Sequence, residues 1–144
     1  FEGVSGPQFA SHGAVRALQR GLPMDRVFWM SAIDPASPCG LGILPDLPRR
    51  VPSNHLVFHG RTRVLTSQRR GRELDITVAA DHPAFEDYVE LFKVWLTRST
   101  DPVSSIVVET INGEPAQGSP YRSSLDRIFA THADRGALHL ERRY

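Results

Sequence analysis

The sequence is poor in two residue types that often carry chemistry, because it has one cysteine, Cys39, and one lysine, Lys93. A single thiol cannot form an internal disulfide, and without a Cys/His cluster an ordinary structural zinc site is not expected. No apolar run approaches the roughly 18 residues that a membrane span requires. We therefore expect a folded, cytoplasmic domain with no membrane contact.

Sequence motifs that accompany catalysis are also missing. The only lysine lies in an amphipathic segment, so the chain has no glycine-rich phosphate loop with its lysine and hydroxyl residue. No G-x-S-x-G pattern marks a nucleophilic serine, and Cys39 has no evident histidine partner. His55 and His59 are four residues apart but have no third ligand nearby. We expect no catalytic residue, metal or cofactor in this chain.

The positive charge comes almost wholly from arginine and is concentrated between residues 49 and 72, although the net charge is only +1. A planar guanidinium suits phosphate oxygens and base edges. The candidate DNA-binding arginines are Arg49, Arg50, Arg61, Arg63, Arg69, Arg70 and Arg72. Trp29 is a further candidate that could stack on a base. A GC-rich genome, which encodes arginine in place of lysine, explains the arginine total about equally well.

The first third of the chain predicts one helix, one strand and a long loop. Ser11 can cap a helix from about His12 to Arg20. The apolar run from Val27 to Ile33 is typical of a buried strand. Between Asp34 and Pro52, five prolines and two glycines predict an ordered surface loop.

The region from Asn54 to Val78 predicts a three-stranded antiparallel meander with turns at Gly60 and Gly71. In its last strand Leu74, Ile76 and Val78 alternate with polar residues, so one face is expected to be buried.

The remaining segments alternate between helix and strand. Aromatic and apolar residues at three- and four-residue spacing predict a helix from Pro83 to Arg98 whose aromatic stripe packs on the sheet. Residues 103–111 predict a strand, Ser119-Pro120 the start of a helix, and residues 137–140 a last strand. We expect residues 1–144 to form a single α+β domain, with an antiparallel β-sheet or small β-barrel flanked by about three helices.

Three sequence blocks resemble a known family in order and spacing. They are Glu2-Gly3-Val4-Ser5-Gly6-Pro7-Gln8-Phe9-Ala10, Ser31-Ala32-Ile33-Asp34-Pro35, and Ile111-Asn112-Gly113-Glu114-Pro115-Ala116 followed by Ser119-Pro120. The blocks are similar to those of the Lhr (large helicase-related) family of superfamily 2 helicases. The similar region is the C-terminal, DEAD/DEAH-associated module that follows the two RecA-like motor domains and the winged helix.

The resemblance implies that the chain is all or part of a C-terminal accessory module of an ATP-dependent 3′-to-5′ DNA helicase that acts in DNA repair. ATP and magnesium would then bind motor domains outside this chain, which begins with Phe1 rather than methionine. The implied partners are single-stranded or forked DNA and the helicase's own winged-helix and RecA-like domains. An alternative is a protein-interaction module that docks on the winged helix or on a repair partner without touching DNA.

Overall fold

The computed structural model describes residues 7, 9–21 and 23–144. The α+β class is confirmed, because these residues form four α-helices, one six-stranded sheet and one three-stranded sheet. Neither sheet closes on itself within the described residues, so the structure is not a β-barrel. The first of the three motif blocks, Glu2 to Ala10, lies mostly outside the described residues.

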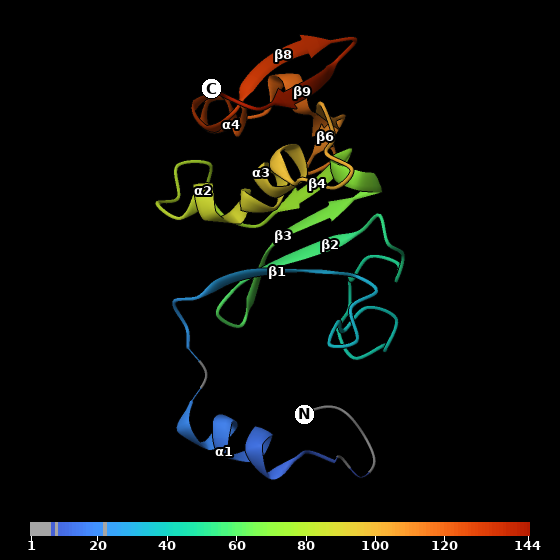
Figure 1. Ribbon diagram of the computed structural model, residues 1–144, viewed down its shortest axis with the longest axis vertical. Helices are drawn as coiled ribbons and strands as arrows, with labels where there is room; N and C mark the ends of the chain where they lie inside the picture. Colours follow the sequence, from blue (N-terminus) through green and yellow to red (C-terminus); the bar gives the residue numbers. More distant parts are fainter. Residues whose placement is uncertain (1–6, 8, 22) are drawn as a thin grey trace.

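Figure 1 shows the elements stacked in layers along the long axis. The larger sheet has the order β1 (Val27–Ser31), β2 (His55–His59), β3 (Thr62–Gln68), β4 (Glu73–Ile76), β6 (Thr110–Ile111), β7 (Glu114–Pro115). The smaller sheet has the order β5 (Ile106–Val108), β9 (Ala137–Glu141), β8 (Ala130–Asp134). The helices are α1 (His12–Arg20), α2 (Phe85–Tyr88), α3 (Glu90–Thr97) and α4 (Arg122–Ile128), with short 3₁₀ turns η1 (Arg69–Gly71) and η2 (Ala116–Gly118).

The predicted meander is confirmed, because β2, β3 and β4 pair antiparallel in sequence order. The larger sheet is antiparallel as predicted except at one place, where β4 pairs parallel with β6. The parallel pairing arises because the chain leaves β4, crosses through α2 and α3, and returns in the same direction. The Asn112 side chain extends this parallel pairing. Its Oδ1 accepts from the Ile76 N–H at 2.7 Å, and its Nδ2 donates to the Ile76 carbonyl at 3.0 Å.

The single strand predicted for residues 103–111 was also wrong, because the segment divides at Glu109 into β5 and β6. The two strands belong to different sheets. At the break, the backbone N–H groups of Glu109 and Thr110 both donate to the Arg72 carbonyl, at 2.7 and 3.1 Å. This bifurcated contact turns the chain from the smaller sheet into the larger one.

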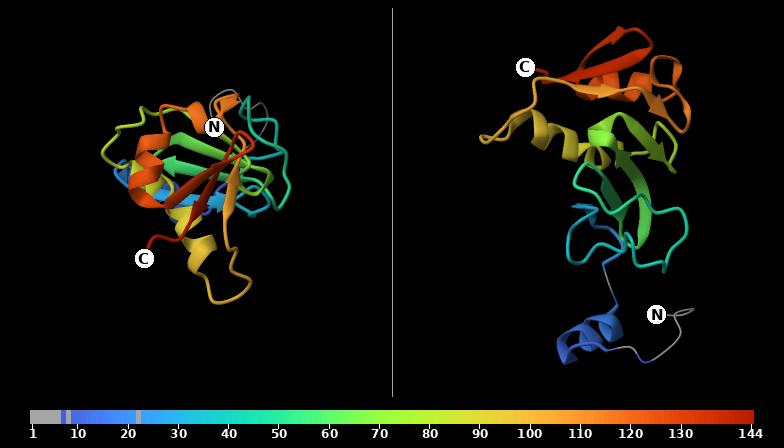
Figure 2. Two further views of the ribbon diagram at one scale, coloured as in Figure 1. Left: turned by 90° about the horizontal axis from the view of Figure 1, so that it is seen from above. Right: turned by 90° about the vertical axis from the view of Figure 1, so that its right-hand side faces the viewer.

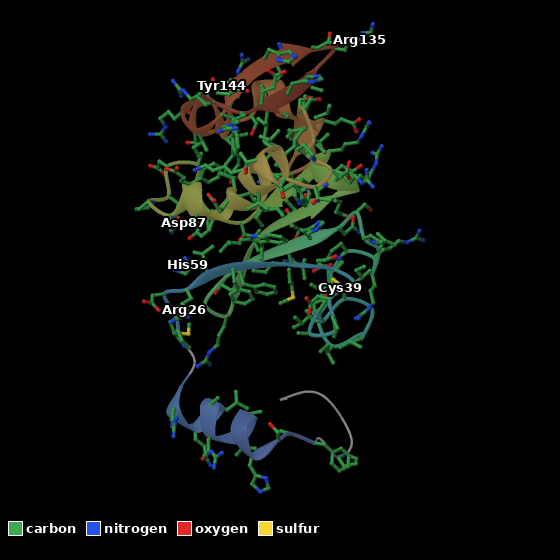
Figure 3. All side chains as sticks on the ribbon, viewed as in Figure 1. Arg26, Cys39, His59, Asp87, Arg135 and Tyr144 are labelled. Atoms are coloured by element: carbon green, nitrogen blue, oxygen red, sulfur yellow. The ribbon has the colours of Figure 1, made fainter. Side chains whose placement is uncertain are left out.

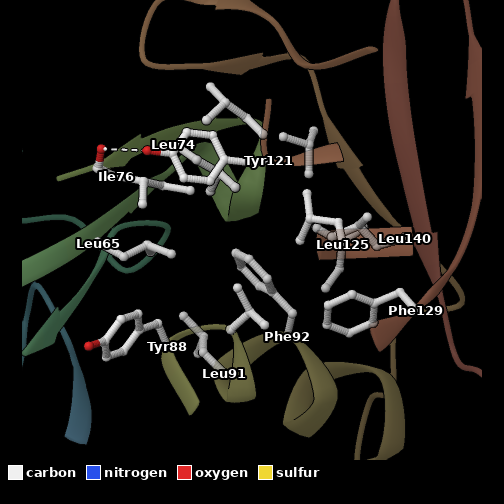
Figure 4. Close-up of a cluster of buried hydrophobic side chains, with 14 of the residues drawn as sticks. Leu65, Leu74, Ile76, Tyr88, Leu91, Phe92, Tyr121, Leu125, Phe129 and Leu140 are labelled. Atoms are coloured by element: carbon white, nitrogen blue, oxygen red, sulfur yellow. Dashed lines mark hydrogen bonds between the residues drawn. The ribbon is translucent and has the colours of Figure 1, made fainter. Parts of the chain in front are cut away.

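The helix predicted for residues 83–98 is interrupted at Val89, whose φ of −99° and ψ of 7° separate α2 from α3. Its aromatic stripe packs as expected, since Tyr88 and Phe92 are fully buried. Figure 4 shows these side chains meeting Leu65 of the larger sheet on one side and Leu140 of the smaller sheet on the other. The helix pair therefore forms the layer between the two sheets.

Strand β1 is not the buried strand that its apolar residues predict. It lies at the end of the larger sheet, and Phe28 and Trp29 are 43% and 39% exposed. Helix α1 is capped as expected, since the Ser11 hydroxyl accepts from the Ala14 N–H at 3.2 Å. No residue of α1 is buried, and Figures 1 and 2 show the helix standing apart from the rest of the chain.

The proline-rich segment from Asp34 to Pro52 is irregular, as predicted, and Arg50 holds it together. The Arg50 guanidinium donates to four backbone carbonyl groups of the segment and its entrance, those of Ile33, Asp34, Ser37 and Cys39. Cys39 packs beneath this clamp in a small cluster with Ala32 and Leu56. The buried thiol therefore serves as an apolar core group.

The C-terminal part differs from expectation in two places. Helix α4 begins at Arg122 rather than after Ser119, although the Ser119 hydroxyl accepts from the Tyr121 N–H at 3.3 Å. Strand β8 was not predicted, and it forms a hairpin with β9 through Arg135 and Gly136. No helix among the described residues is long and apolar enough to cross a bilayer.

Candidate nucleic-acid interface

Three of the candidate arginines line one cavity of about 450 Å³. We call this cavity the arginine groove. Its lining residues are Pro52, His55, Arg69, Arg70, Arg72, Trp95, Arg98, Asp101, Val103, Ser105, Ile106 and Val107. The groove therefore receives residues from the β3–β4 turn, from the end of α3 and from β5, which brings one helix and parts of both sheets to a single site.

The turn between β3 and β4 presents its arginines through an unusual backbone. Arg69, Arg70 and Gly71 have successive φ values of 53°, 59° and 91°, in the left-handed region that disfavours side chains other than glycine. The Arg70 N–H donates to the Ser53 carbonyl at 2.8 Å, and the Arg69 N–H to the Asn54 Oδ1 at 3.1 Å. The preceding loop thus holds the turn in a conformation that its residues would not adopt alone.

Carboxylates oppose most of the groove's positive charge. Arg69 contacts Glu73 at 2.6 Å and Glu109 at 3.4 Å, and Arg72 contacts Glu109 at 2.6 Å. The hydrogen bond to Glu73, with the charge of Glu109, raises the pKa of the Arg69 guanidinium.

At the far side of the groove, Arg98 contacts Asp101 at 3.3 Å. Four guanidinium groups therefore face three carboxylates, which leaves an excess of one positive charge. Within the described part of the chain, no ion pair or hydrogen bond engages the Arg70 guanidinium. Arg70 is thus the cation of the groove that is most available to an incoming anion.

The groove has an aromatic side formed by His55 and Trp95. Their ring centroids are 4.9 Å apart in an edge-to-face arrangement, and His55 also lies 6.0 Å from the Trp29 ring. Burial lowers the pKa of His55 to about 4, so the imidazole is neutral at physiological pH. Its Nδ1 atom is buried without a hydrogen-bond partner. A neutral ring beside an indole provides a surface against which a base or sugar could pack.

The other candidate residues lie outside the groove. Arg50 is engaged in the loop clamp described above, and Arg63 donates to the Asp46 carbonyl at 2.7 Å, which ties β3 to the same loop. Arg49 and Arg61 are exposed. Trp29 lines a different cavity, together with Asp25, Asp87 and Glu90. The seven arginines that are clustered in sequence are therefore not clustered in space.

Two groove residues were not anticipated from the sequence. Trp95 belongs to a helical aromatic stripe, which favoured a core role, but it is only partly buried and borders the groove. Arg98 has a position typical of a cation at a helix C-terminus. Only the packing of α3 across the β3–β4 turn reveals that both face Arg70.

No group of three or more His, Cys, Asp or Glu side chains in the described ranges is arranged to hold a metal ion. Comparison with known proteins gives no match to a family model, to a curated protein or to a solved structure.

Proposed function

We propose that the chain is a DNA-engaging C-terminal module of an ATP-dependent 3′-to-5′ DNA helicase, and that the arginine groove holds phosphates of the tracking strand. The observation that carries this proposal is the convergence of Arg69, Arg70, Arg72 and Arg98 on one cavity. Guanidinium groups bind phosphate oxygens in a fixed geometry, and phosphate contacts position a strand without reading its sequence.

The helicase assignment is supported by the three motif blocks, which occur in the order of the Lhr family. Under this assignment ATP and magnesium act in the RecA-like domains, the whole protein is cytoplasmic, and its work lies in DNA repair. This module has no catalytic step of its own. It contributes the arginine side chains that hold the strand while the motor domains move it.

The structure favours a graded role for the arginines. Arg70 can approach a phosphate directly, whereas Arg69 and Arg72 must share their positive charge with Glu73 and Glu109. Trp95 and His55 can pack against the nucleoside that follows the bound phosphate. We assign the cavity, of about 450 Å³, to a single strand because its aromatic side can pack against an unpaired base.

The test is the salt dependence of single-strand binding, measured by fluorescence anisotropy with a labelled oligonucleotide. Replacement of Arg69, Arg70 and Arg72 by alanine should reduce the magnitude of the slope of log K against log salt by up to about 2, since each lost phosphate contact removes about 0.7. The matched control replaces Arg122, Arg127 and Arg142 by alanine. These arginines lie outside the groove, and their replacement removes the same amount of positive charge. If both variants change the slope equally, the groove is not the DNA site.

The alternative function is a protein-interaction module that does not touch DNA. It is favoured by helix α1, on which Val15 and Leu18 are 42% and 61% exposed although they share one side of the helix. If this alternative holds, the 144-residue chain binds no single strand at low salt but associates with the separately purified winged-helix and motor domains.

A further inference from the structure

A second cavity, of about 480 Å³, lies at the free edge of the larger sheet. We call it the acidic pocket, and it is lined by Asp25, Val27, Phe28, Trp29, Asp87 and Glu90. Three of these six residues carry carboxylates, two are aromatic and none is basic. Figure 3 shows Asp87 above His59 and Arg26 on one side of the molecule, with Cys39 on the other.

The backbone of β1 is unpaired along this pocket. Among residues 7, 9–21 and 23–144, strand β1 pairs only with β2. The Gly60 N–H donates to the Arg26 carbonyl at 2.8 Å, and the Ala32 N–H donates to the Asn54 carbonyl at 2.8 Å. Because hydrogen-bonded positions alternate along an antiparallel strand, the N–H and C=O groups of Val27 and Trp29 must point away from β2. Two donors and two acceptors therefore face outward beside the carboxylates.

This edge has none of the features by which proteins usually protect an exposed strand. Edge strands are commonly blocked by charged residues, by proline or by a bulge. Strand β1 has the sequence Val-Phe-Trp-Met-Ser, with no charge and no proline, and its register with β2 is continuous from Val27 to Ser31. Its aromatic residues Phe28 and Trp29 are 43% and 39% exposed. Such an edge is free to pair with a further strand.

The side chains beside the β1 edge determine which charge a pairing strand should carry. The Trp29 ring lies 6.0 Å from His55, which in turn meets Trp95 of α3, so Trp29 is on the face of the sheet that the helices cover. Asp87 and Glu90 come from the ends of α2 and α3 on that same face. A strand added to β1 would place every second side chain between these carboxylates and the indole ring.

That position suits a guanidinium or ammonium group. Carboxylates attract the cation and the indole face adds a cation–π contact. A phosphate backbone would be repelled by the same carboxylates, so this edge and the arginine groove select partners of opposite charge. Glu90 is partly neutralised by Lys93 at 3.6 Å, which leaves Asp25 and Asp87 as the main attraction.

We propose that the edge of β1 and the acidic pocket form a docking site for an extended protein segment that pairs with β1 and places an arginine or lysine side chain between Trp29 and the carboxylates. Backbone hydrogen bonds supply affinity in this mode, and the pocket supplies specificity. The site is separate from the arginine groove and does not depend on DNA binding.

The test uses the 144-residue chain and the synthetic peptide acetyl-Thr-Arg-Val-Arg-Val-Arg-Thr-amide, followed by nuclear magnetic resonance of the ¹⁵N-labelled protein. The amides of Val27 and Trp29 should become protected from hydrogen exchange, and the Trp29 indole resonance should shift. Replacement of Asp25, Asp87 and Glu90 by their amides should weaken peptide binding at least tenfold. The same replacement at Asp75, Glu114 and Asp134, which lie outside the pocket, should leave binding unchanged.

Two control peptides distinguish the contribution of backbone pairing to binding from the contribution of charge. A peptide with glutamate at the arginine positions should not bind, and one with a central proline should bind at least tenfold more weakly. Equal binding of the glutamate peptide, or protection confined to α1, would overturn the proposal. A concentration-dependent dimer that protects Val27 and Trp29 without peptide, seen by sedimentation, would also overturn it, because the occupant would then be a second copy of the chain.

Discussion

At the scale of single residues, the arginine groove is defined as much by its carboxylates as by its arginines. Glu109 touches two of the arginines, at 2.6 Å from Arg72 and 3.4 Å from Arg69. Exposed ion pairs of this kind contribute little to folding, about 0–1 kcal/mol. They fix the direction of long side chains and lower the local positive potential. Under the proposed function, Glu109 therefore weakens the binding of a phosphate in the groove.

Replacing Glu109 by glutamine should consequently strengthen single-strand binding. The amide keeps the shape of the side chain and its backbone contacts but frees the charge of Arg72, whereas Arg69 stays paired with Glu73 at 2.6 Å. We expect affinity at low salt to rise several-fold and the magnitude of the salt slope to increase by up to about 0.7, the value of one additional phosphate contact. Anisotropy titrations measure both quantities.

The matched control is Glu114→Gln, which removes a carboxylate of β7 that lies outside the groove. If the two variants bind alike, Glu109 does not restrain the arginines.

At the scale of elements, the β3–β4 turn of the groove depends on glycine at position 71. Gly71 has a φ of 91°, and a Cβ atom there would lie 2.6 Å from the Ile106 Cγ2. Gly71→Ala should therefore destabilise the protein by about 2 kcal/mol, through backbone strain and overpacking. Urea denaturation checks this value. Gly118→Ala, where no atom lies within 4 Å, should change stability by less than about 0.5 kcal/mol.

The elements that the sequence predicts correctly are those whose pattern is local. Leu74 and Ile76 alternate with polar residues and are buried, and Tyr88 and Phe92 keep helical spacing and pack inward. The segment around Glu109 was misread because β5 and β6 are continuous in their apolar pattern, and the break depends on contacts with Arg72.

The candidate site was predictable only in part, for the same reason. Arg69, Arg70 and Arg72 are neighbours in sequence, so their common position follows from the turn. Trp95 and Arg98 join them only through tertiary packing, because α3 crosses the turn after some twenty intervening residues. Arg50 was selected for its charge, but its guanidinium satisfies buried carbonyl groups of a loop. Sequence shows which cations exist, and packing decides which are available.

At the scale of the whole molecule, helix α1 is attached to the body without being packed on it. No residue of α1 is buried. A shortened chain that begins at Pro23 should therefore keep the thermal unfolding midpoint within about 2 °C of the full chain, because no core contact is lost. Differential scanning calorimetry measures the shift, and Leu125→Ala, which removes a fully buried side chain, should cost about 2–5 kcal/mol as a control.

A fall of the midpoint on shortening, by as much as in the Leu125→Ala variant, would show that α1 packs on the body in solution.

The arginine groove joins residues of the larger sheet, through η1, to residues of the smaller sheet, through β5. A DNA strand bound in the groove would contact residues of both sheets at once. Under the proposed function, a shift of one sheet relative to the other would change the spacing of the arginines and aromatic rings that hold the strand.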